Sequence, residues 1–98
     1  KKMENIFEAI SAQAANVAPF GAKLKFVLGE SIILIDGTGD SNIVSQNDEE
    51  ANCTISTDPE TFLALKNGEL NPMMAVMSGK IKIKGDMGLA MKLQSLIQ

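Results

Sequence analysis

Apolar side chains recur along the chain with two different periods, and the change of period separates helices from strands. Near the N-terminus they recur every three or four residues, which predicts an amphipathic helix over residues 3–17 that ends before Pro19. The face of this helix that we expect to be buried consists of Met3, Phe7, Ile10, Ala14 and Val17.

The next segments show the period of two that is typical of strands. Together with one unbroken apolar run, this alternation predicts five strands at residues 23–28, 31–36, 42–45, 51–56 and 80–84. The run at 31–36 is apolar on both faces, so we expect it to form a central strand that is covered on both sides. The alternating strands are expected to direct inward the side chains of Leu24, Phe26, Leu28, Ala51, Cys53 and Ile55.

Three polar residues predict where the later helices begin. Asp58 and Asn71 are each followed by Pro, and Asp86 precedes an apolar run, so all three are expected N-caps. The resulting order is one helix, four strands, two short helices, one strand and one helix. This order predicts an α+β fold, with one mostly antiparallel sheet covered by four to five helices. A length of 98 residues is enough for one domain, spanning residues 1–98.

The final helix, from Met87 onward, is expected to have two apolar edges. At 100° per residue, Met87 and Met91 lie on one edge. The other edge is a broad arc formed by Leu89, Ala90, Leu93, Leu96 and Ile97. We therefore expect the arc to seal the sheet and the methionine edge to face a removable ligand.

Composition limits the chemistry that the chain can perform. Histidine and arginine are absent, and the net charge is −3. The absence of His removes the commonest general base and metal ligand, and the acidic balance argues against nucleic-acid binding. Five of the six methionines lie between Asn71 and Leu96, and such a cluster can form an adaptable apolar surface.

No cofactor, metal site or catalytic constellation is expected. The loop Asp36–Asp40 lacks the spacing of a calcium loop, and Gly85–Gly88 contains an acid where an RNA-binding Gly-x-x-Gly loop would meet phosphate. Cys53 is expected to be buried and inert. Five lysines are expected on the outer face of the sheet, where they keep this face solvated: Lys23, Lys25, Lys80, Lys82 and Lys84. A secondary role is the attraction of anionic lipid surfaces, in a transient membrane contact, or of the phosphates of an acyl thioester.

A single cysteine cannot form an internal disulfide, which suits a reducing compartment. The sequence shows no signal-peptide pattern, no apolar run of about 18 residues and no peroxisomal C-terminal signal. We therefore expect a cytoplasmic monomer, either a stand-alone form or a module excised from a larger protein.

The C-terminal half resembles sterol carrier protein-2 domains. The most specific segments are Gly79-Lys80-Ile81-Lys82-Ile83 and Gly85-Asp86-Met87-Gly88-Leu89-Ala90-Met91-Lys92-Leu93, with weaker support from Thr61–Leu65 and Leu70-Asn71-Pro72. The resemblance implies a five-stranded sheet and helices that enclose an apolar tunnel. It also implies that the chain binds fatty acids, fatty acyl-CoA, sterols or phospholipids without chemistry and transfers or presents them inside the cell.

On this resemblance we expect a lipid to contact both stiff and flexible side chains. The flexible methionines Met73, Met77, Met87 and Met91 are expected to fold into the empty tunnel and withdraw when lipid enters. The full expected lining is Phe26, Ile33, Ile35, Phe62, Leu65, Met73, Val76, Met77, Ile83, Met87, Leu89 and Met91.

The sequence departs from the family at one place and leaves alternatives open. Family members often have aromatic residues and a Gln just before the Gly of the fifth strand, where this chain has Val76, Met77 and Ser78. The alternatives are a lipid-binding accessory or scaffold module of a biosynthetic complex, for example one that handles quinone precursors, and a domain of a larger lipid-metabolising enzyme. An enzyme acting on acyl thioesters is disfavoured by the missing His and Arg.

Overall fold

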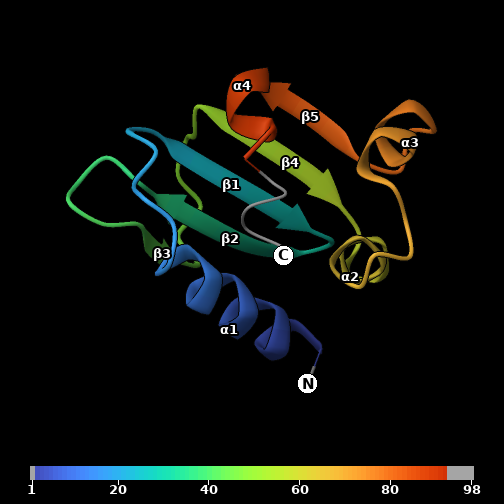
Figure 1. Cartoon of the computed structure of the whole chain (residues 1–98), viewed down its shortest axis with the longest axis horizontal. Coiled ribbons are helices and arrows are strands. Elements are labelled where there is room, and N and C mark those ends of the chain that lie inside the picture. Colours follow the sequence, from blue (N-terminus) through green and yellow to red (C-terminus); the bar gives the residue numbers. More distant parts are fainter. Residues whose placement is uncertain (1, 93–98) are drawn as a thin grey trace.

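The computed structural model describes residues 2–92, with side chains from residue 5 onward. This part of the chain forms four helices and five strands, which follow one another in the order predicted from the sequence (Figure 1). Their bounds are α1 Lys2–Ala14, β1 Lys23–Leu28, β2 Ser31–Asp36, β3 Ile43–Ser45, β4 Cys53–Thr57, α2 Pro59–Lys66, α3 Pro72–Met77, β5 Lys82–Gly85 and α4 Met87–Ala90.

The five strands form one sheet in the order β3-β2-β1-β4-β5. Three of the four neighbouring pairs are antiparallel, and β1 and β4 are parallel. The predicted α+β fold with one mostly antiparallel sheet is confirmed. Residues 31–36 form an interior strand as expected, because β2 lies between β1 and the edge strand β3, and β1 occupies the middle of the sheet.

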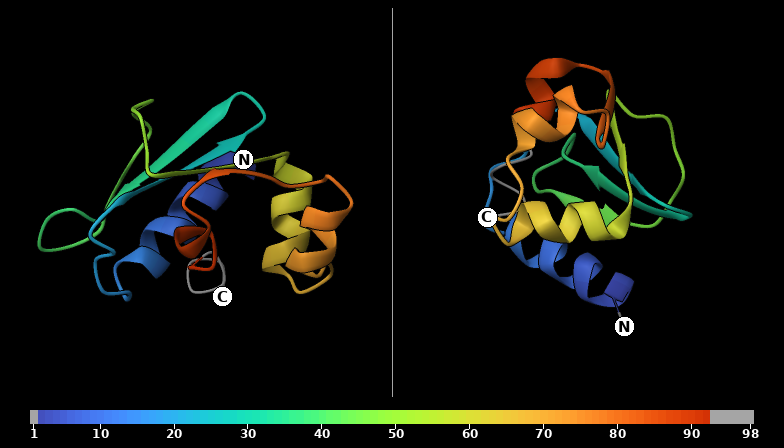
Figure 2. Two further views of the ribbon diagram at one scale, coloured as in Figure 1. Left: turned by 90° about the horizontal axis from the view of Figure 1, so that it is seen from above. Right: turned by 90° about the vertical axis from the view of Figure 1, so that its right-hand side faces the viewer.

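All four helices lie on one side of the sheet (Figure 2). The strand face that they cover carries the core, since Leu24, Phe26 and Leu28 of β1 are buried. The register places Phe26 beside Ile33 of β2 and Ile55 of β4 on this face. The remaining buried apolar residues in the same cluster are Ile6, Ile10, Ala14, Ile35, Cys53, Phe62, Leu65, Ala75, Ile81, Leu89 and Ala90.

The opposite face of the sheet carries lysines, as the alternation predicted. On this face Lys25 lies beside Leu34, which is buried. The Nζ atom of Lys25 lies 2.9 Å from a carboxylate oxygen of Asp48, and that of Lys23 lies 2.8 Å from one of Glu49. These pairs hold the segment between β3 and β4 against the outer face, so that β2 is covered on both sides as expected.

The three predicted N-caps are confirmed. The side chains of Asp58, Asn71 and Asp86 accept backbone N–H bonds at the first turns of α2, α3 and α4. Gly68 and Gly79 follow the C-caps of α2 and α3 with positive φ angles, which glycine adopts without a steric cost.

The N-terminal helix differs from its prediction. It ends at Ala14 rather than Val17, because the Asn42 side-chain amide donates to the carbonyl oxygens of Ala14, Val17 and Ala18 and holds the chain in a turn. Its buried side chains also include Ile6, which the predicted face omitted.

The boundaries of the last two elements also differ from their predictions. The fifth strand begins at Lys82 rather than Lys80, and the final helix ends at Ala90. Leu89 and Ala90 of the expected sealing arc are buried. The rest of that arc, Leu93, Leu96 and Ile97, lies outside the described residues.

Gly85 allows β5 to approach the chain at the start of β4. Its φ is +106°, and a Cβ atom there would overlap the carbonyl oxygen of Asn52, which accepts the Asp86 N–H at 2.8 Å. We therefore expect Gly85→Ala to lower the free energy of unfolding by about 2–4 kcal/mol in urea denaturation. Gly39→Ala is the matched control, because no atom lies within 4 Å of a Cβ at Gly39. The control is expected to change stability by less than about 0.5 kcal/mol, and equal effects of the two changes would contradict the close approach.

Candidate functional site

The helix-covered face of the sheet and the helical side chains that pack on it are apolar, and we call this set of side chains the inner wall. Strand alternation explains why it is apolar, since every second residue of each strand faces the helices. The strands contribute Phe26, Ile33, Ile35, Cys53, Ile55 and Ile83, and the helices contribute Phe62, Leu65, Ala75 and Leu89.

Two aromatic rings meet at the centre of the inner wall. Phe26 of β1 and Phe62 of α2 are at most 1% exposed, and their ring centroids lie 5.6 Å apart at an interplanar angle of 77°. This edge-to-face contact is a favoured aromatic geometry. The contact holds α2 over the central strand β1. The connection to the sheet is short as well, since Asp58 caps α2 directly after β4 ends at Thr57.

The inner wall offers no polar group for catalysis. Among the side chains described, no polar or charged residue is buried. The buried residue that carries a reactive group is Cys53, whose thiol is buried on β4. Burial raises the pKa of the Cys53 thiol above its ordinary value, and the nearby negative charge of Asp86 raises it further. The thiol is therefore held in its protonated, weakly nucleophilic form.

The structure brings seven of the predicted lining residues into or beside the core. Six are buried, and Ile83 is partly buried and packs against them. These seven are Phe26, Ile33, Ile35, Phe62, Leu65, Ile83 and Leu89.

The other five predicted lining residues are exposed. The exposed fractions are 67% for Met73, 37% for Val76, 77% for Met77, 59% for Met87 and 78% for Met91. The expectation that the four methionines fold into the interior of the lipid-free protein is therefore wrong. The reason lies in helix length, because α3 and α4 have six and four residues and direct only Ala75, Leu89 and Ala90 into the core.

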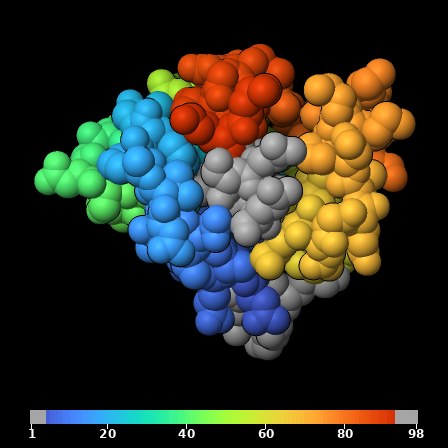
Figure 3. Space-filling view, viewed as in Figure 1, coloured from blue at the N-terminus to red at the C-terminus, as the bar shows by residue number. Residues whose placement is uncertain are grey.

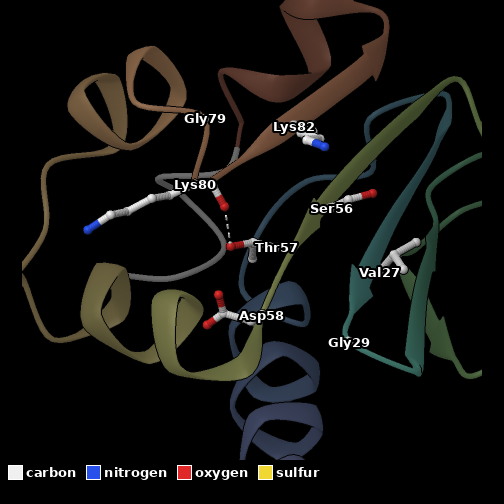
Figure 4. A pocket seen from close by; sticks show the side chains of 8 residues that line it. All are labelled: Val27, Gly29, Ser56, Thr57, Asp58, Gly79, Lys80 and Lys82. Atoms are coloured by element: carbon white, nitrogen blue, oxygen red, sulfur yellow. Dashed lines mark hydrogen bonds between the residues drawn. The ribbon is translucent and has the colours of Figure 1, made fainter.

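A surface depression, which the sequence did not predict, lies where β1 and β4 end and β5 begins (Figure 4). It is an open pocket of about 300 Å³ lined by Val27, Gly29, Ser56, Thr57, Asp58, Gly79, Lys80 and Lys82. Two of its polar side chains are engaged in structural bonds. Thr57 Oγ1 donates to the Lys80 carbonyl at 2.8 Å, and the Asp58 carboxylate accepts from the Thr61 N–H at 2.7 Å. The bonds from Thr61 lower the pKa of Asp58.

Metal-ligand clusters and membrane-spanning helices are both absent from the described residues. Within residues 2–92, no group of three or more His, Cys, Asp or Glu side chains is arranged to hold a metal ion. The same part of the chain contains no helix with the length and apolarity required to cross a bilayer.

Comparison with known sequences shows likeness over nearly the whole chain. The family model described as the SCP-2 sterol transfer family matches residues 3–98. Sterol carrier protein 2 of Bos taurus is 36% identical over 97 residues, which cover 98% of this chain and 18% of the bovine protein. Sterol carrier protein 2 of Homo sapiens is 48% identical over 58 residues, which cover 59% of this chain and 11% of the human protein. The chain thus spans less than a fifth of the length of these relatives.

Solved structures share the fold. The sterol carrier protein domain 2 of Helicoverpa armigera matches with a TM-score of 0.65 and 30% identity, over 96% of this chain and 72% of that one. Sterol carrier protein-2 of Aedes aegypti, solved in complex with the C16 fatty acid palmitate, matches with a TM-score of 0.76 and 20% identity over 99% and 94%. A ubiquinone synthesis protein, UbiJ-SCP2, matches with a TM-score of 0.70 and 13% identity over 96% and 86%. The last two likenesses concern the fold alone.

Because its pKa is raised, the Cys53 thiol should react slowly in the folded protein. Near about pH 8 the folded chain holds a smaller fraction of thiolate than the unfolded chain, and burial excludes the reagent as well. We expect Ellman's reagent to label Cys53 at least about tenfold more slowly in native buffer than in denaturing guanidinium chloride. Equal labelling rates in the two solutions would place the thiol outside the inner wall.

Proposed function

The chain belongs to the SCP-2 sterol transfer family, and on that premise we propose that it binds single lipid molecules by their hydrocarbon tails and transfers them inside the cell. The ligand class comprises fatty acids, fatty acyl-CoA, sterols and phospholipids. Transfer takes place between membranes or to enzymes that use the lipid, and we assign no chemical step to this chain.

One observation carries the proposal. The inner wall is apolar across its full width, from β2 through β1 and β4 to β5, and no buried charged or polar residue interrupts it among the described side chains. A surface of this kind provides burial for a hydrocarbon tail and no group that recognises a polar substrate.

The energy of burial is sufficient for this role. Each methylene of a tail that leaves water gains about 0.8 kcal/mol, so that a dozen gain about 10 kcal/mol before the costs of association. Micromolar affinity corresponds to about 8 kcal/mol. Because methylene contacts discriminate weakly between tails, we expect broad specificity.

We assign tail contact to the buried part of the predicted lining: Phe26, Ile33, Ile35, Phe62, Leu65, Ile83 and Leu89. These side chains meet over β1 and β4, with the Phe26–Phe62 pair at the centre. The exposed methionines are not assigned to this wall. We propose that the tail enters an apolar tunnel along this wall.

The proposal also includes the cellular compartment and the oligomeric state of the protein. A buried, unpaired Cys53 is compatible with a reducing compartment, of which the cytoplasm is one. We propose a monomer that contacts membranes transiently while it exchanges lipid.

A second candidate is an accessory module that holds a lipidic intermediate for biosynthetic enzymes. The observation that favours it is the fold shared with the ubiquinone synthesis protein. It predicts a stable complex with an enzyme, whereas transfer predicts that the protein exchanges palmitate between vesicles in the absence of any partner.

Binding should stabilise the folded state, since the tail contacts the inner wall only when the wall is formed. At a free palmitate concentration about 100-fold above Kd, the gain is about 2.7 kcal/mol, which corresponds to an increase in Tm of roughly 11–22 °C for a domain of this size. Differential scanning calorimetry at increasing palmitate concentrations measures the shift. A Tm that does not change would contradict lipid binding.

A polar group in the inner wall should weaken binding. Ile83 is partly buried on β5, so Ile83→Ser places a hydroxyl on the wall without emptying the centre of the core. We expect about tenfold weaker palmitate binding in isothermal titration calorimetry. Ile43→Ser on the edge strand β3 is the matched control, because Ile43 is 62% exposed and lies outside the wall. Palmitate affinities that are equal in the two variants would exclude this wall as the site.

A further inference from the structure

The strand β5 has one side on which the sheet ends. It stands last in the strand order, and Lys82, Lys84 and Gly85 are exposed along it. α3 and α4 lie at its two ends (Figure 1). The orange and red atoms of α3, β5 and α4 form the upper right margin of the molecule in the space-filling view (Figure 3). The outer side of β5 is therefore an exposed sheet edge, and a further strand can pair with such an edge.

The register determines which backbone groups this edge presents. The Asp86 N–H donates to the Asn52 carbonyl at 2.8 Å, and from this bond the hydrogen-bonded pairs of β4 and β5 recur at every second residue. The backbone groups of Lys84 and Lys82 therefore face β4, whereas the N–H and C=O groups of Ile83 point away from it. In the described part of the chain, no hydrogen bond outside the sheet is formed by the backbone of Ile83. A strand added at this edge would satisfy both groups.

The side chains of β5 divide between the two faces of the sheet. Lys82 and Lys84 are exposed on the outer face, and Ile83 lies on the opposite face at the border of the inner wall. The two lysines of β1 on the outer face are paired with the carboxylates of Glu49 and Asp48. Among the described residues, the two lysines of β5 form no such ion pair. Positive charge without an internal partner thus lies on one face of the edge, and an apolar side chain lies on the other.

We propose that the edge of β5 binds an extended acidic segment of a partner protein by antiparallel strand addition. The segment has the alternating pattern acidic-apolar-acidic. Its acidic side chains lie beside Lys82 and Lys84 on the outer face, and its apolar residue lies opposite Ile83 and exchanges both backbone hydrogen bonds with it. In strand addition, main-chain bonds provide affinity and the alternate side chains provide specificity. This inference goes beyond the proposed lipid function and does not depend on it.

The charge pattern selects this occupant over a second copy of the chain. Two β5 strands paired with one another would bring the lysines of both copies together, and like charges on neighbouring strands destabilise a sheet. Lysines on an exposed edge are a common protection against such self-pairing. The other sheet edge, β3, contains no lysine and is followed by the acidic run Asp48-Glu49-Glu50. Of the two edges, β5 is therefore the one that offers opposite charge to an acidic segment.

Addition of a short peptide to the full chain tests the proposal. The probe is Thr-Glu-Val-Glu-Thr with acetylated and amidated ends, and heteronuclear NMR spectra follow its binding. We expect the largest amide shifts at residues 82–85. At a free peptide concentration about tenfold above Kd, hydrogen exchange of the Ile83 N–H is expected to slow about tenfold, because only the unoccupied edge exchanges.

Two charge-reversal variants test the lysines. Lys84→Glu is expected to weaken peptide binding about fivefold, because an attraction between neighbouring strands becomes a repulsion. Lys66→Glu makes the same change of charge at an exposed lysine on α2, and as the matched control it should bind the peptide as wild type does. Equal effects of the two changes would show that net charge, and not the edge of β5, decides binding.

A second peptide, with an N-methyl group on its valine, separates strand pairing from charge attraction. It keeps both glutamates but lacks the N–H that bonds to the Ile83 carbonyl, so we expect binding about tenfold weaker. Equal binding of the two peptides would overturn strand addition, as would spectra that do not change at millimolar concentrations of the unmethylated peptide. Amide shifts confined to β3 would place the site at the wrong edge. Dimers of the free protein that the peptide dissociates would identify a second copy as the occupant and overturn the acidic partner. Palmitate takes no part in these measurements, so failure of either proposal leaves the other unaffected.

Discussion

The parallel pairing of β1 with β4 is the constraint on which the rest of the structure depends. It places β4, and through β4 the edge strand β5, beside the first strand of the chain, although β2 and β3 intervene in the sequence. Asn52, which directly precedes β4, links this strand to β1 and β5. Its side-chain oxygen accepts the Lys23 N–H at 2.9 Å, its N–H donates to the Lys23 carbonyl at 3.0 Å, and its own carbonyl accepts the Asp86 N–H at 2.8 Å. Without this pairing the inner wall would be divided into two separate apolar strips.

The sequence was informative where a local rule decides the structure. Strand alternation predicted the inward side chains of β1, and the Asp58, Asn71 and Asp86 caps predicted the starts of three helices, because both depend on neighbouring residues only. The central position of β1 could not be predicted in this way. It depends on a pairing between residues almost thirty positions apart, for which hydrophobicity gives no signal, and β2 is more apolar than β1.

The candidate site was predicted in part for the same reason. Phe26, Ile33 and Phe62 are apolar in segments with clear periods, so their burial followed from the pattern. The methionines were assigned to the interior because of their residue type. Their exposure depends on the small size of α3 and α4, which cannot bury more than one side of so few residues.

The proposed lipid site on the inner wall has a consequence for the route by which a lipid is exchanged. A tail held on the inner wall and a tail in a bilayer are both out of water, so its transfer between the two is nearly neutral in free energy. A route through water exposes the methylenes, at a cost of about 10 kcal/mol for a dozen of them. An apolar wall alone can therefore bind a lipid but exchanges it slowly. A carrier of this kind needs in addition a surface that removes water between the wall and the membrane.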